Sequence, residues 1–119
     1  VALAGEDLEL YSGNDDQTLP ILSLGGKGVI SVTAYIIPDE MHDICEAYWK
    51  GDHKEACRLQ LSTLGIFDAL FCEVNPIPVK GAMNMLGFDV GECHLPLVDL
   101  SEAHKEFVKN ELKKYGLLK

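Results

Sequence analysis

The fold of this chain is decided by the stretch from Tyr11 to Ala34, YSGNDDQTLPILSLGGKGVISVTA. A short apolar run, Leu8 to Tyr11, predicts a strand that leads into it, and the polar residues after Ser12-Gly13 open a helix. The core-facing side of this helix is formed by Leu19, Ile21, Leu22 and Leu24. A glycine pair ends the helix, and the β-branched run Val29 to Ala34 predicts a second, buried parallel strand. The unit is therefore β-α-β.

The two predicted strands are parallel, so their carboxyl ends should lie at one rim. In α/β folds the chemistry takes place at this rim. Those ends lead into Ser12-Gly13-Asn14 and Thr33-Ala34-Tyr35. We expect Gly13 to tolerate no side chain, since its turn requires either a positive φ or close approach of the backbone to a ligand. The glycines from Gly25 to Gly28 do not form a phosphate loop, because they lead from a helix into a strand and not the reverse.

The rest of the chain predicts four more helices, at about residues 38–50, 52–74, 80–86 and 101–115. The second has a capping-box start at Asp52, and Gly65 inside it indicates close approach of a neighbouring helix. NPIPV at residues 75–79 forms a rigid elbow, because its prolines force extended geometry on the residues before them. Ser101 or Asp99 caps the last helix.

Length and charge narrow the class of protein. A closed (β/α)8 barrel takes about 250 residues, and this chain has 119. Its net charge of −9 argues against nucleic-acid binding, which depends on basic side chains. No stretch approaches the roughly 18 apolar residues of a membrane span. We expect a cytoplasmic protein and, since the chain begins at Val1 without a charged and apolar leader, a fragment or processed product and not a secretory precursor.

The four cysteines form no CxxC pair, and each lies in or beside an apolar helical pattern: Cys45, Cys57, Cys72 and Cys93. We therefore expect buried free thiols and no metal site.

Three motifs carry a family resemblance: SGNDD followed by GGKGVISVTA, NPIPVK at residues 75–80 and HLPL at residues 94–97. Their order and spacing resemble the 4-hydroxy-tetrahydrodipicolinate synthases, also called dihydrodipicolinate synthases, from about Leu8 to Leu118. The resemblance implies an α/β fold. Residues 1–51 would be the last two βα units, with strands 7 and 8, of a TIM (β/α)8 barrel, and residues 52–119 a C-terminal helical domain.

The resemblance also implies a function for the full-length parent. Enzymes of this family are lyases that condense pyruvate with aspartate 4-semialdehyde through a lysine Schiff base, in lysine (diaminopimelate) biosynthesis. The Schiff-base lysine is expected upstream, so this chain has no catalytic residue and should be inactive alone. Substrate-binding positions that match are Gly13 and Ile30, the latter through its main-chain carbonyl. No cofactor or metal is implied, and the parent would be a homotetramer, with the helix that carries Leu19, Leu22 and Leu24 near a contact between dimers.

Departures and alternatives stay open at this point. The family often has Asp at Asn14, Asn at Tyr35 and Arg at His94. An N-acetylneuraminate or keto-deoxy-sugar aldolase shares the barrel and the imine, and the missing nucleophile leaves a non-catalytic interaction fragment as a third hypothesis. A Schiff base on Lys80 or Lys27 is a further alternative, but Lys80 begins a helix whereas the family nucleophile is on a strand, so we expect Lys80 to make a structural ion pair or a solvent contact.

Overall fold

The computed structural model describes residues 2, 3, 5 and 7–119. Its elements, in chain order, are β1 (Tyr11–Ser12), the 3-10 turn η1 (Asp15–Gln17), α1 (Thr18–Ser23), β2 (Gly28–Val29), the 3-10 turn η2 (Thr33–Tyr35), α2 (Pro38–Trp49), α3 (His53–Ser62), α4 (Leu64–Leu70), α5 (Ile77–Met85) and α6 (Glu102–Lys114). The chain divides into two compact units, Val1–Leu64 and Gly65–Lys119. The assignment of residues 1–51 and 52–119 to a barrel and a helical domain stays a prediction.

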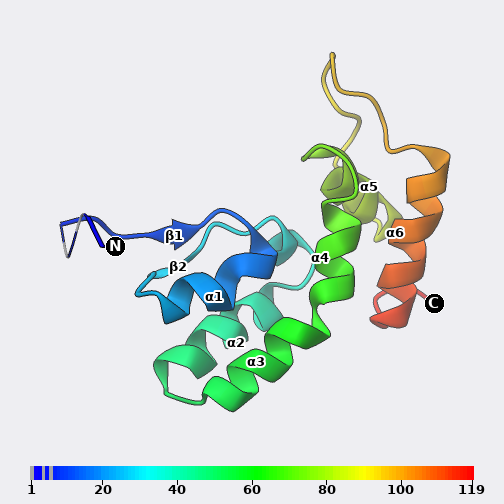
Figure 1. The fold of residues 1–119 in the computed structure, drawn as a ribbon. Coiled ribbons are helices and arrows are strands. Elements are labelled where there is room, and N and C mark those ends of the chain that lie inside the picture. The colour runs from blue at the N-terminus through cyan, green and yellow to red at the C-terminus, as the bar shows by residue number, and fades with distance from the viewer. Residues whose placement is uncertain (1, 4, 6) are drawn as a thin grey trace. The chain divides into compact units, whose positions relative to one another are not determined.

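The β-α-β prediction is confirmed in the first unit. β1 and β2 pair in parallel, with Tyr11 opposite Gly28 and Ser12 opposite Val29, and α1 connects them (Figure 1). The ladder continues past both ends, because the Lys27 N–H donates to the Leu10 carbonyl at 2.7 Å and the Ile30 N–H to the Ser12 carbonyl at 2.8 Å.

The second strand is shorter than predicted. Regular pairing ends at Val29, and the chain turns into η2 at Thr33. The reason lies in the backbone donors, since the N–H groups of Val32 and Thr33 bond to the Asp15 carboxylate and not to a strand neighbour. Ile30, expected in a buried strand, exposes 72% of its surface in this chain.

The helix between the strands also differs in detail. It opens as η1 and becomes α-helical only from Thr18, and Pro20 lies in its first turn, where a missing N–H costs little. Leu22 is fully buried as expected. Leu24 is 67% exposed, because it follows the last residue of α1, so its predicted core position is wrong.

The core of the first unit lies between α1, α2 and α3. α2 packs on both neighbouring helices, and its apolar side buries Met41, Ile44 and Cys45. Burial of the Met41 and Ile44 side chains contributes about 1.5–3 kcal/mol each. Trp49, the last residue of α2, is 57% exposed.

The predicted helix over residues 52–74 is two helices, α3 and α4, with a break at Thr63. The Thr63 hydroxyl donates to the carbonyls of Leu59 at 3.1 Å and Gln60 at 3.0 Å. A threonine that bonds to the preceding turn competes with the helical ladder, which accounts for the break. The predicted start is confirmed, because the Asp52 carboxylate accepts from the Glu55 N–H at 3.0 Å.

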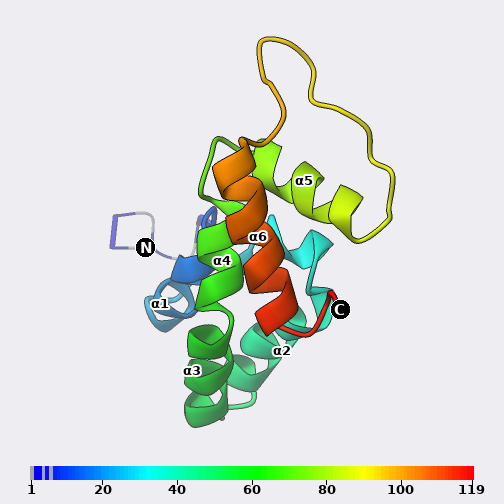
Figure 2. The same cartoon turned by 90° about the vertical axis from the view of Figure 1, so that its right-hand side faces the viewer.

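The second unit contains α5 packed against α6, joined by a long connector that loops away from both helices (Figure 2). α5 begins at Ile77, three residues before the predicted start, since proline is tolerated in a first helical turn. A Cβ on Gly65 would lie 2.6 Å from Glu111 Oε2 of α6, so the neighbour at Gly65 is the end of a flexible side chain, and the predicted close approach of a neighbouring helix stays a prediction. Ser101 caps α6 by accepting from the His104 N–H at 3.4 Å.

The thiols differ from one another. Cys45 is buried, and burial raises its pKa above the ordinary value. Cys57, in α3, is exposed, and Cys72 and Cys93 are only half-buried, so the expectation of four buried thiols is confirmed for Cys45 alone. No helix in the described ranges is long and apolar enough to cross a membrane.

Candidate functional site

The turn after β1 is held by the side chain of Ser12. Its hydroxyl donates to the Asn14 carbonyl at 2.7 Å and accepts from the Asn14 N–H at 3.3 Å. Gly13 lies between these two residues with a φ outside the left-handed region, so a positive φ is not what its turn requires. A Cβ added at Gly13 would meet no described atom within 4 Å. The turn is therefore open above Gly13.

The structure brings Gly13 and Ile30 to the same end of the strand pair. Ser12 is opposite Val29 in the parallel register, so the next residues along the two strands are Gly13 and Ile30. The hydrogen bond from the Ile30 N–H to the Ser12 carbonyl keeps that register beyond the paired strands. The two positions that the family resemblance implies for substrate binding are thus neighbours at the carboxyl ends of the strands.

A buried carboxylate joins the two strand ends. Asp15 is 1% exposed, and its Oδ2 accepts from the Val32 N–H at 3.2 Å, the Thr33 N–H at 3.0 Å and the Thr33 hydroxyl at 2.9 Å. The expectation that the segments after β1 and β2 share one rim is confirmed by these bonds. The other oxygen, Oδ1, is buried and has no hydrogen-bond partner among the described residues.

Gln60 of α3 bonds to the main chain of this rim. Its Nε2 donates to the carbonyls of Asp15 at 3.1 Å and Asp16 at 3.2 Å, and its Oε1 accepts from the Leu19 N–H at 3.2 Å. Gln60 is only 5% exposed, and all three bonds span more than forty residues of sequence. Asp15 and Gln60 are not predicted as site residues from the sequence, because the polar residues around Asp15 predict only a helix start and Gln60 has no predicted role. A polar residue in the apolar pattern of α3 was the one signal available.

Neither lysine considered as a nucleophile lies at this rim. Lys27 precedes β2, at the amino end of the pair, and lines a hollow of about 340 Å³ along α2. Lys80 belongs to α5 in the second unit, where its Nζ donates to the main-chain carbonyl of Glu92. That contact is structural, but its acceptor is a peptide group and not the expected ion partner or solvent.

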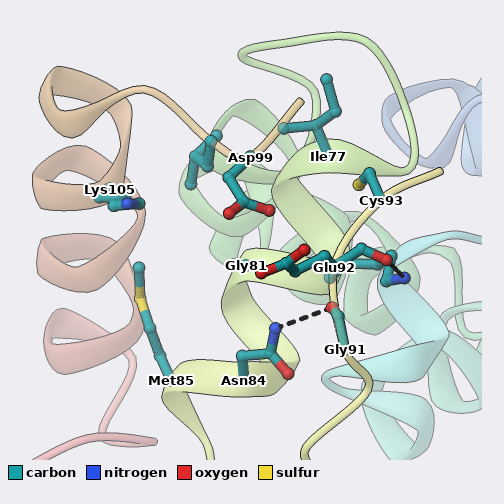
Figure 3. Close-up of a pocket in the computed structure, with 11 residues that line it drawn as sticks. Ile77, Gly81, Asn84, Met85, Gly91, Glu92, Cys93, Asp99 and Lys105 are labelled. Atoms are coloured by element: carbon teal, nitrogen blue, oxygen red, sulfur yellow. Dashed lines mark hydrogen bonds between the residues drawn. The ribbon is translucent and has the colours of Figure 1, made fainter. Parts of the chain in front are cut away.

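Lys80 borders a cavity of about 380 Å³ between α5 and the connector (Figure 3). The polar groups on its wall hold the connector in place. Asn84 donates from Nδ2 to the Gly91 carbonyl at 3.2 Å, the dashed line in Figure 3, and accepts at Oδ1 from the Val90 N–H at 2.8 Å. The cavity thus lies between α5 and a connector that is hydrogen-bonded to this helix.

The positions that depart from the family pattern are at the surface. Asn14 and His94 are exposed, and Tyr35 is 66% exposed in η2, next to the residues that bond to Asp15. Within the described residues, no group of three or more His, Cys, Asp or Glu side chains is placed to hold a metal ion.

Comparison with known proteins shows which family the sequence of this chain matches. Residues 1–115 match the dihydrodipicolinate synthetase family. The chain is 53% identical to 4-hydroxy-tetrahydrodipicolinate synthase of Clostridium tetani over 118 residues, which is 99% of this chain and 40% of that protein. It spans about 40% of the length of such curated relatives.

Solved structures agree with the sequence comparison. Dihydrodipicolinate synthase of Thermotoga maritima superposes with a TM-score of 0.92 at 42% identity, covering 98% of this chain and 39% of that one. The chloride-inhibited synthase of Acinetobacter baumannii, complexed with pyruvate, superposes with a TM-score of 0.90 at 38% identity, covering 98% and 40%. The mostly helical α/β fold described above thus matches part of the TIM-barrel structures of dihydrodipicolinate synthases, and the chain belongs to the dihydrodipicolinate synthetase family.

Proposed function

We propose that this chain is the carboxyl-terminal portion of a 4-hydroxy-tetrahydrodipicolinate synthase, with β1 and β2 as the last two strands of its barrel and the later helices as its C-terminal domain. The complete enzyme, meaning this chain joined to the upstream portion that its relatives possess, condenses pyruvate with aspartate 4-semialdehyde. The observation that carries the proposal is the juxtaposition of Gly13 and Ile30 at the carboxyl ends of a parallel pair, in a chain 53% identical to such a synthase.

The chemistry requires a nucleophile that this chain does not bring to the rim. In the proposed reaction, an upstream lysine amine condenses with the pyruvate carbonyl, and water leaves. The imine then loses a methyl proton, and the resulting enamine carbon attacks the aldehyde. In this reaction scheme, both bond-forming steps take place on a lysine of the upstream portion.

The proposed contribution of this chain is the substrate-facing wall. Gly13 leaves open space above its turn, which suits a residue that a substrate approaches closely. Ile30 would present its main-chain carbonyl beside the bound keto acid, with its amide held by the Ser12 carbonyl at 2.8 Å. We propose Gly13 and Ile30 as substrate-binding residues, in a homotetrameric cytoplasmic enzyme of lysine biosynthesis that uses no cofactor.

Borohydride trapping tests the proposal. The complete enzyme is incubated with pyruvate, reduced and digested, and the modified peptide is identified by mass spectrometry. We expect a single pyruvate adduct, on a lysine upstream of Val1. An adduct on Lys27 or Lys80, or on the isolated 119-residue chain, would contradict it.

The choice of aldehyde separates the synthase from the sugar aldolases of the same superfamily. Steady-state rates are measured with pyruvate and either aspartate 4-semialdehyde or an aldose acceptor. We expect turnover with the semialdehyde and at most trace turnover with the sugar. The reverse preference, or trapping without turnover on either acceptor, would contradict the synthase assignment.

A further inference from the structure

The carboxylate of Asp15 is bonded more completely on one oxygen than on the other. Oδ2 accepts three hydrogen bonds, two of them from consecutive main-chain amides, Val32 and Thr33. These amides follow Ile30 by two and three residues, so the carboxylate fixes the course of the chain directly after it. The same residue lies two positions after Gly13. Asp15 therefore sets the relative position of the two proposed substrate-binding residues.

The second oxygen of Asp15 is the unusual one. Oδ1 is buried, yet none of the described residues donates to it. Buried carboxylate oxygens are almost always hydrogen-bonded, because an unmet acceptor keeps its full desolvation cost. The chain covers only about 40% of its relatives, so a donor can come from the remainder of the protein.

We propose that Asp15 is a positioning residue of the substrate rim, and that its Oδ1 accepts a hydrogen bond from a donor in the portion of the enzyme outside this chain. The inference rests on the proposed function. In the complete enzyme, Asp15 joins three segments: the turn after β1, the turn after β2 through Oδ2, and an upstream segment through Oδ1. Loss of the third link lets the rim shift and weakens the hold on pyruvate.

Asp15→Asn separates the roles of the two oxygens. Three donors converge on the Oδ2 position, so the amide oxygen of asparagine must occupy it, and the amide NH2 group then occupies the Oδ1 position. That NH2 group would meet the proposed upstream donor head-on. Without such a donor, asparagine keeps every bond that Asp15 makes in this chain.

The experiment measures the KM for pyruvate and kcat of the complete enzyme, well below its melting temperature. Rates are normalised to active sites counted by borohydride trapping. For Asp15→Asn we expect the KM for pyruvate to rise about tenfold or more, since displacements of the order of an ångström are costly at a reacting site. The matched control is Asp16→Asn, which removes the same charge from the adjacent, exposed carboxylate and should leave the KM unchanged.

Several results overturn the inference. If the KM of Asp15→Asn equals that of the wild type, there is no upstream donor to Oδ1. If the melting temperature falls while the KM stays unchanged, the role of Asp15 is merely structural. If Asp15→Asn does not fold, Thr33→Val removes one of the three Oδ2 bonds and should still raise the KM, while Thr33→Ser, which keeps the hydroxyl, restores it. An unchanged KM in Thr33→Val then contradicts the inference.

Borohydride trapping distinguishes a failure of the proposed function from a failure of the positioning role of Asp15. An unsubstituted complete enzyme that traps no pyruvate contradicts the proposed function and this inference together. Normal trapping by that enzyme, with an unaltered KM in Asp15→Asn, contradicts the positioning role alone.

Discussion

The side-chain amide of Gln60 donates to the main-chain carbonyl of Asp15 at 3.1 Å, so a residue of α3 fixes the turn that follows β1. The two residues are 45 positions apart in the sequence. Gln60 also meets the Asp16 carbonyl and the Leu19 N–H, which leaves the start of η1 and α1 bonded to a helix outside the β-α-β unit. The candidate rim therefore depends on α3 as well as on its own strands.

Gln60→Ala should destabilise the protein, because it leaves buried carbonyls and an amide without partners. Each unmet buried group costs about 1–3 kcal/mol, and we expect a loss of this order, measured as a lower midpoint in urea. Gln17→Ala is the matched control, since Gln17 is exposed in η1. Equal midpoints for the two variants would contradict a supporting role for Gln60.

Glu73 predicts a pH dependence in the second unit. Its Oε1 accepts from the Ser101 hydroxyl at 2.6 Å and from the Ser101 N–H at 3.2 Å, and it lies 2.6 Å from His104 Nδ1. The hydrogen bond from the Ser101 side chain, and then that from His104, lowers the pKa of Glu73 below its ordinary value. A carboxylate with a lowered folded-state pKa contributes stability above its unfolded-state pKa of about 4.3 and loses it as the pH falls through the folded-state pKa.

Glu73→Gln should therefore lower the melting temperature at pH 7 and have a progressively smaller effect as the pH falls below about 4. Differential scanning calorimetry across this range gives the difference from wild type at each pH. Glu106→Gln, an exposed position on α6, provides the control. A Glu73→Gln difference that stays constant with pH would show that the bonds to Ser101 and His104 do not depend on its charge.

Gly13→Val should affect substrate use more than folding. A Cβ at Gly13 meets no described atom within 4 Å, and the φ of Gly13 is not left-handed, so neither crowding nor strain within this chain opposes a side chain. We expect a higher KM for aspartate 4-semialdehyde in the complete enzyme, with a smaller rise for Gly13→Ala and little change in melting temperature. Unchanged kinetics in both variants would remove Gly13 from the substrate site.

The β-α-β unit could be predicted from sequence because its signals are local: an apolar run, a glycine pair and a β-branched run within 24 residues. The end of β2 could not, since it depends on Asp15 capturing the amides of Val32 and Thr33 from 17 and 18 residues away. The break at Thr63 could not be predicted either. Helix-forming residues lie on both sides of it, and the apolar spacing does not show that the Thr63 hydroxyl bonds to the preceding turn.

The site was predicted only in part for the same reason. The family resemblance implied Gly13 and Ile30 as site residues. Their proximity follows only once β2 ends at Val29, because the longer predicted strand, Val29 to Ala34, placed Ile30 near its amino end. Asp15 and Gln60 act through contacts that no spacing reveals. Their polarity fits a helix start or a solvated helix face equally well until the fold buries them.

Leu24→Asp tests the proposed tetramer. Leu24 is 67% exposed after α1, whereas Leu22 is buried and cannot contribute to a subunit contact. A charge at an apolar subunit contact carries a desolvation cost, so we expect the variant of the complete enzyme to sediment as a smaller species. Leu61→Asp, at a leucine of α3 that is 61% exposed, should leave the sedimentation unchanged. Identical behaviour of the two variants would place the contact elsewhere.

The isolated 119-residue chain should be inactive and prone to aggregate. In the described part of the chain β1 and β2 pair only with each other, so each has one unpaired edge, and an open strand edge pairs readily with other chains. Large apolar side chains in or next to these strands are exposed, Ile30 by 72% and Tyr11 by 46%. Leaving a large apolar side chain in water forgoes about 1.5–3 kcal/mol, a substantial part of the 5–15 kcal/mol that stabilises a typical domain.

The helices of both units keep their own buried contacts, so the far-ultraviolet circular dichroism should still show helix. Expression of residues 1–119 alone, followed by light scattering, thermal melting and a condensation assay, checks each part: a monodisperse monomer with a cooperative melt would contradict the edge argument, and measurable condensation would contradict the assignment of the nucleophile to the upstream portion.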